Sequence, residues 1–119
     1  MDSEEFRQWS RTAADWGADY RAGLRARPVR AQTKPGDIAR QIADAAPEAG
    51  EAMETIFADF ERIIPDGLTH WQHPRFFAYF PANAAPVSVL AEQIANAMAA
   101  QAMLWQTAPA ATEIEEVMV

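Results

Sequence analysis

Hydrophobic and polar positions recur with helical spacing through most of the chain. The first predicted helix runs from about residue 3 to residue 24 and carries apolar side chains at intervals of three and four, which places them on one face. These residues are Phe6, Trp9, Ala13, Trp16, Tyr20 and Leu24. Ser3 is the predicted N-cap, followed by Glu4 and Glu5 in the first turn, where the helix dipole favours acidic groups. The aromatic face fits either ordinary core packing or contact with a partner.

Two further helices are predicted before the middle of the chain. An extended connector passes through Pro28 and Pro35 and leads to a short predicted helix at residues 37–45. A third helix is predicted at residues 51–64, where Pro65-Asp66-Gly67 provides the turn chemistry that ends it. The side chains predicted to face inward from this helix are Met53, Ile56, Phe57, Phe60 and Ile64.

The last third of the chain predicts two more helices and completes a mainly α fold. The fourth, at residues 87–104, is rich in alanine, and small side chains allow close helix packing, which predicts burial on most sides. The fifth begins after Thr107, its predicted N-cap, and is still in mid-period at Val117-Met118-Val119. We expect a cut there, or a junction with a second polypeptide.

An aromatic loop separates the third and fourth predicted helices. It holds five aromatic rings within ten residues, at Trp71, Phe76, Phe77, Tyr79 and Phe80. A loop this apolar is costly in water unless something covers it. It is therefore expected either to fold under a core or to line a pocket.

Composition and charge narrow the classes of function. A chain of 119 residues is one domain by length, and its net charge of −7 argues against binding nucleic acid. The apolar stretch at residues 94–104 is too short to span a bilayer, so no membrane partner is expected. The acidic start fits a cytoplasmic protein. The absence of cysteine excludes disulfides and thiol chemistry.

The residues alone do not form a complete active site. His70 and His73 could share a metal ion, but Pro74 and the loop context favour a histidine that orients the loop through a hydrogen bond. The serines have no evident His/Asp pair nearby. The single lysine, Lys34, lies in an open Pro-Gly connector where nothing would activate its amine for Schiff-base chemistry. We predict no catalytic residue and no metal site within the chain.

The order of motifs resembles the N-terminal segment of the group II pyridoxal-phosphate-dependent decarboxylases of the aromatic-L-amino-acid decarboxylase type. The resemblance rests on Asp66-Gly67-Leu68-Thr69-His70-Trp71-Gln72-His73-Pro74, on Phe77-Ala78-Tyr79-Phe80-Pro81 and on Ala108-Pro109-Ala110-Ala111-Thr112-Glu113-Ile114-Glu115. It covers essentially the whole chain.

This resemblance implies a fold-type I enzyme whose α/β cofactor domain, with its Schiff-base lysine, lies outside this chain. Pyridoxal 5'-phosphate would be bound by residues outside this chain. Residues 1–85 would form a helical dimerisation segment with the substrate loop at residues 69–82, and residues 86–119 would begin the large cofactor domain. The implied partners are the remaining polypeptide, the second subunit of an intertwined homodimer and an amino-acid substrate.

The resemblance also implies which residues form the substrate pocket. By position, Trp71, Tyr79, Phe80 and Pro81 would hold the side chain of the substrate. Three departures change that pocket: Ala82 replaces a hydroxyl residue, and Gln101 and Met103 stand where the family often has isoleucine and phenylalanine, contributed to the neighbouring subunit.

A pocket with these residues would be more polar and more adaptable than one built for catechols. Indole, phenol and non-aromatic substrates remain open, as does decarboxylation against oxidative deamination. The alternative function is a stand-alone helical interaction module that binds another protein through the loop and the first helix.

Overall fold

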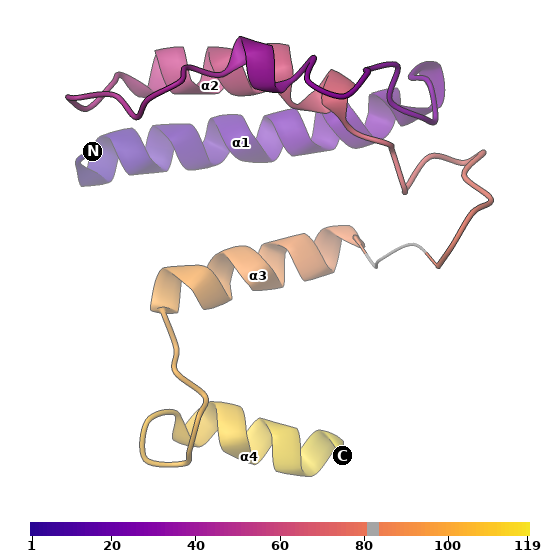
Figure 1. The fold of residues 1–119 in the computed structure, drawn as a ribbon. Coiled ribbons are helices and arrows are strands. Elements are labelled where there is room, and N and C mark those ends of the chain that lie inside the picture. Colours follow the sequence, from indigo (N-terminus) through magenta and orange to yellow (C-terminus); the bar gives the residue numbers. More distant parts are fainter. Residues whose placement is uncertain (81–83) are drawn as a thin grey trace. The chain divides into compact units, whose positions relative to one another are not determined.

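The computed structural model describes residues 1–80 and 84–119. The chain divides into two compact units, Met1–Pro81 and Ala82–Val119, and each is described by itself. Every regular element of the described residues is helical, as Figure 1 shows, so the predicted mainly α fold is confirmed. None of the helices in these residues is long and apolar enough to cross a bilayer.

The first unit begins with helix α1, Ser3–Gly23, which continues into the short 3-10 helix η1, Leu24–Ala26. The N-cap of α1 is Asp2, so the prediction of Ser3 is wrong by one residue. The Asp2 carboxylate accepts hydrogen bonds from the N–H groups of Glu4 and Glu5 at 2.8 and 2.9 Å. The Glu5 carboxylate in turn accepts from the Asp2 N–H at 3.0 Å. This reciprocal capping box satisfies three N–H donors at the start of the helix, which a cap at Ser3 would not do.

Helix α2, Met53–Ile63, lies along α1 and runs in the same direction (Figure 1). Two ring contacts join the helices: Trp9 meets Phe57 at 5.3 Å between ring centroids, and Trp16 meets Phe60 at 4.8 Å. The aromatic face of α1 is therefore used for packing within this unit. The inward face predicted for α2 is wrong at Ile56 and Ile64, which are exposed. Ile63, which is not predicted to face inward, is buried. Leu24 is the other buried hydrophobic residue of the described chain.

The predicted helix at residues 37–45 is reduced to a single 3-10 turn, η2, Ala39–Gln41. The Asp37 side chain accepts from the Lys34 N–H at 2.7 Å, and the Gln41 amide donates to the Asp37 carbonyl at 3.1 Å. These local bonds close one turn, and the residue before Pro47 is disfavoured in a helix. A second 3-10 turn, η3, Pro65–Gly67, follows α2. At Gly67 a Cβ atom would lie 2.8 Å from Ile38 Cδ1, so a larger residue there would need the Ile38 side chain to move.

The second unit contains α3, Pro86–Met98, and α4, Pro109–Met118. Helix α3 ends before the predicted residue 104, because Ala99 adopts a left-handed conformation with φ of 48°. The expected burial of α3 on most sides is also wrong for this structure, in which no residue of α3 is buried. Thr107 does not cap α4: its hydroxyl bonds the carbonyls of Gln101 and Leu104 at 2.6 and 2.9 Å, and Ala108 takes the cap position.

Candidate functional site

The aromatic loop is anchored at its base by two hydrogen bonds to the connector, one between backbone groups and one that the Thr69 side chain accepts. The His70 N–H donates to the Val29 carbonyl at 2.9 Å, and the Ala31 N–H donates to Thr69 Oγ1 at 3.3 Å. Two consecutive turns follow, in which the His73 N–H donates to the His70 carbonyl and the Phe76 N–H donates to the His73 carbonyl, both at 2.9 Å. The base of the loop is thereby held against residues 29–31, although no strand forms there.

The rings of the loop lie outside the core of the first unit. Trp71 stacks with Phe76 at 5.1 Å and with Tyr79 at 5.7 Å between centroids. Trp71 is 43% exposed, Tyr79 83% and Phe80 98%. Within the first unit, Trp71, Tyr79 and Phe80 are therefore not folded under a core. Tyr79 has a φ of 54°, a conformation that costs a non-glycine residue of order 1–3 kcal/mol and that clusters at functional sites.

His70 orients the loop through a hydrogen bond, as the sequence predicts. Its ring is only 3% exposed, and Nδ1 lies 2.8 Å from the Tyr20 hydroxyl of α1. Burial lowers the pKa of His70, and the positive charge of Arg27 lowers it further, against a smaller opposing effect of Asp66. Both effects favour the neutral form of the imidazole.

His73 is equally buried and uses its ring differently. Its Nδ1 accepts from the Arg75 N–H at 3.0 Å, which leaves the proton on Nε2. That buried Nε2 has no hydrogen-bond partner among the described residues. The two histidines thus have both Nδ1 atoms engaged within the protein. No cluster of three or more metal-ligating side chains forms within residues 1–80 and 84–119.

The predicted substrate residues fall into three groups in the structure. Trp71 and Tyr79 are in ring contact, and Phe80 follows Tyr79 as an exposed side chain. Gln101 and Met103 are exposed residues of the second unit, in the segment between α3 and α4. The remaining two residues, Pro81 and Ala82, lie outside the described residues.

The role of Tyr20 beside this loop is not predicted from the sequence. The pattern places Tyr20 on the apolar face of the first helix and His70 in the loop, and 50 residues separate them. The sequence offers only two separate hints. Tyr20 carries a hydroxyl on an otherwise apolar helix face, and His70 needs a hydrogen-bond partner if it is buried. Nothing local in the sequence joins the two.

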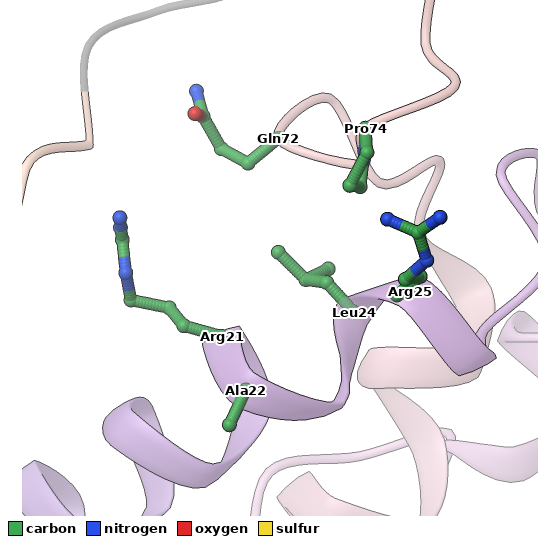
Figure 2. Close-up of a pocket in the computed structure, with 6 residues that line it drawn as sticks. All are labelled: Arg21, Ala22, Leu24, Arg25, Gln72 and Pro74. Atoms are coloured by element: carbon green, nitrogen blue, oxygen red, sulfur yellow. The ribbon is translucent and has the colours of Figure 1, made fainter.

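A small notch near the loop has a different chemistry from an aromatic slot. It has a volume of about 190 Å³ and is lined by Arg21, Ala22, Leu24, Arg25, Gln72 and Pro74. Figure 2 shows the Arg21 guanidinium and the Gln72 amide beside the same opening, with Leu24 between the two arginines. None of the predicted substrate residues lines it. We therefore assign the candidate site to the exposed ring cluster and not to this notch.

Comparison with known proteins shows which family the chain belongs to. Residues 35–119 match the family model of the pyridoxal-dependent decarboxylase conserved domain. The chain is similar to aromatic-L-amino-acid decarboxylase of Rattus norvegicus, with 41% identity over 118 residues, which are 99% of this chain and 25% of the rat protein.

Two solved structures of related proteins superpose on nearly the whole chain. The Rhodiola rosea 4-hydroxyphenylacetaldehyde synthase superposes with a TM-score of 0.92 at 40% identity, covering all of this chain (100%) and 26% of that one. The Catharanthus roseus tryptophan decarboxylase in complex with L-tryptophan gives 0.91 at 32% identity, covering 98% and 24%.

In each of these relatives the matched residues form one helical segment of a longer protein. The chain belongs to the pyridoxal-dependent decarboxylase family, and the resemblance to group II decarboxylases is confirmed. It spans about a quarter of the length of the curated relatives it matches.

Proposed function

We propose that this chain is part of a pyridoxal-phosphate-dependent L-amino-acid decarboxylase with an aromatic substrate, and that it supplies substrate-pocket residues and dimer contacts. The observation that carries the proposal is the loop itself. Its base is fixed to the connector and to α1, while the rings of Phe77, Tyr79 and Phe80 are more than four-fifths exposed. An anchored loop with exposed rings needs another surface to complete it.

The proposal places the cofactor outside this chain, and the position of Lys34 supports it. Lys34, the single lysine, is exposed in the connector, and its backbone N–H is bonded to Asp37. A Schiff-base lysine requires a desolvated site with a partner for its amine. The cofactor is therefore assigned, as part of the proposal, to residues outside this chain. Residues 1–119 are given no bond-breaking or proton-transfer step of their own.

The loop would orient the substrate and exclude water from the pocket. Stacked rings such as Trp71 and Tyr79 grip a flat side chain, and each well-placed aromatic contact contributes about 0.5–1.5 kcal/mol beyond area burial. Gripping the side chain fixes the torsion of the bond that breaks relative to the cofactor ring. Phe80, Pro81 and Ala82 are proposed to continue this pocket, and Gln101 and Met103 to contribute to the pocket of the neighbouring subunit.

The proposal places dimer contacts on surfaces that this chain leaves exposed. The aromatic face of α1 packs on α2, so α1 offers mainly Phe6 at its start. Apolar side chains of α3 and α4 remain exposed, including Leu90, Ile94 and Ile114. The division into a dimerisation segment at residues 1–85 and the start of the cofactor domain at residues 86–119 stays a prediction, as does the cytoplasmic location.

The test uses a complex of this chain with the polypeptide that supplies the remainder of the family's length. Co-expression with added pyridoxal phosphate is expected to yield a yellow complex that releases carbon dioxide from an aromatic L-amino acid. L-tryptophan, L-tyrosine and L-phenylalanine are assayed in parallel, with ammonia and aldehyde measured to separate decarboxylation from oxidative deamination. A colourless complex without activity on any of them contradicts the proposal.

A further inference from the structure

We propose that Tyr20 is a positioning residue for the substrate loop, acting through His70 to fix the location of Trp71. The inference rests on the proposed function of the loop. The observation that carries it is a contact across 50 residues of sequence, in which the Tyr20 hydroxyl lies 2.8 Å from Nδ1 of a histidine that is 3% exposed. A bond between two side chains this far apart in sequence fixes the loop to α1.

Tyr20 is itself held from two sides. Its ring stacks on Trp16 at 5.2 Å between centroids, with 12° between the planes. The Arg27 guanidinium lies 5.5 Å from the centre of the Tyr20 ring, and Arg27 also pairs with Asp66 at 3.2 Å. A ring fixed in this way presents its hydroxyl at one position, so the phenol acts as a rigid arm and not as a mobile surface group.

The hydrogen bond also links the Tyr20 hydroxyl to the tautomer of His70. The neutral imidazole has one donor and one acceptor nitrogen. When the Tyr20 hydroxyl donates to Nδ1, the proton of the ring lies on Nε2. In either direction of the bond, removal of the hydroxyl leaves the buried Nδ1 of His70 without its partner, which is costly enough to make the ring shift or admit water.

A shift of His70 passes directly to Trp71. The His70 N–H is bonded to the Val29 carbonyl, and the His70 carbonyl accepts from the His73 N–H, so both peptide groups of His70 are engaged. Trp71 is the next residue, and its indole stacks with Phe76 and Tyr79. The orientation of the ring cluster therefore depends on the orientation of His70, and hence on a hydroxyl of α1.

The substitution Tyr20→Phe isolates this role. It keeps the ring that stacks on Trp16 and removes only the hydroxyl. The matched control is Thr12→Val, which removes a hydroxyl from the same helix, where Thr12 Oγ1 bonds only the Gln8 carbonyl at 3.2 Å.

The experiment uses the complete decarboxylase and measures kcat and KM for an aromatic L-amino acid, cofactor absorbance and thermal unfolding. Tyr20→Phe is expected to lower kcat/KM by about tenfold, as the loss of one hydrogen bond to a buried acceptor implies. Cofactor absorbance and melting temperature should stay close to those of the wild type. Thr12→Val should leave all four quantities unchanged.

A double-mutant cycle separates positioning from plain stabilisation. In a Trp71→Ala background, Tyr20→Phe should lower kcat/KM by less than twofold, because the residue through which it acts is gone. An equal loss in both backgrounds overturns the inference, as does an unchanged kcat/KM in the single variant. Wild-type enzyme without decarboxylase activity overturns the proposed function itself, and that outcome is visible before any variant is made.

A second pair of variants tests the same bond from the other side. In His70→Asn the Oδ1 atom stands near the position of Nδ1 and can accept from Tyr20, whereas His70→Leu has no acceptor. His70→Asn should retain several times more kcat/KM than His70→Leu, and this advantage should vanish when Tyr20→Phe is added. An advantage that persists without the Tyr20 hydroxyl contradicts the inference.

Discussion

At the scale of single residues, the loop contains two histidines that are equally buried but have different roles. His70 is bonded to Tyr20 and its pKa is lowered, first by burial and then by Arg27. His73 is buried to the same extent but bonds its own chain two residues on, at the Arg75 N–H. One ring therefore joins the loop to α1, and the other closes a turn within the loop.

The lowered pKa of His70 predicts a pH dependence of stability. The unfolded chain takes up a proton near pH 6.5, while the folded loop resists it to lower pH, so the unfolded state binds more protons in that interval. The free energy of unfolding should therefore fall as the pH drops below about 6.5 and level off below the folded pKa. Amide exchange of residues 66–76 in the complete protein, corrected for intrinsic rates, measures this change. His70→Asn should remove this part of the pH dependence; identical pH profiles for the two proteins would contradict the assignment.

The exposed rings predict a separation of activity from stability. Tyr79 is 83% exposed and Trp71 43%, so truncating either one removes little buried area from this chain. In the complete enzyme, Tyr79→Ala and Trp71→Ala should lower kcat/KM by about tenfold or more, from the loss of one or two aromatic contacts to the substrate. Melting temperatures measured on the same samples should change little. Parallel losses of activity and stability would instead support a core-packing role for these rings.

At the scale of elements, α1 and α2 form one packed pair whose contacts are aromatic. Trp16 is half-buried and touches both Phe60 of α2 and Tyr20 of its own helix. Trp16→Ala should lower the local unfolding free energy by about 2 kcal/mol, below the range for a fully buried ring. Amide exchange of α1 and α2 in the complete protein should rise together. Arg11→Ala, at an exposed position of α1, is the control, and equal effects of both variants would show that the ring pair is not what holds α1 on α2.

Helix ends are harder to predict than helix faces, and the differences have local causes. Asp2 outcompetes Ser3 as a cap because it can form the reciprocal pair with Glu5. The helix expected after Pro35 is limited to one turn by side-chain bonds around Asp37. Thr107 turns its hydroxyl back to preceding carbonyls and leaves α4 to start at Pro109. In each case two or three local hydrogen bonds decide where the helix begins or ends, and the spacing of apolar residues does not reveal them.

At the scale of the whole molecule, the described residues bury little apolar surface. Leu24 and Ile63 are the hydrophobic residues buried among those described. The large apolar side chains left exposed in the second unit include Val87, Val89, Leu90, Ile94, Met98, Met103, Leu104, Trp105, Ile114, Val117 and Met118. Folding free energy is a small difference between large terms, so a core this small leaves little net stability.

This deficit predicts how the isolated 119 residues behave. They should aggregate, or show partial helix without a sharp thermal transition, because the exposed apolar side chains lack their covering surface. Circular dichroism with light scattering measures both properties on one sample. Adding the polypeptide that supplies the rest of the family's length should produce a cooperative transition. A soluble monomer that melts cooperatively by itself would favour the interaction-module alternative.

The sequence by itself determined the helical class, the aromatic face of α1, the loop motif and, through that motif, the family. These are properties of residue spacing and order, and they can be read within a window of one helix or one loop. The tertiary structure decided which rings meet, that the loop faces outward, and that Tyr20 of α1 holds His70. Such pairings join residues tens of positions apart, and they depend on how whole elements pack, which no local pattern encodes.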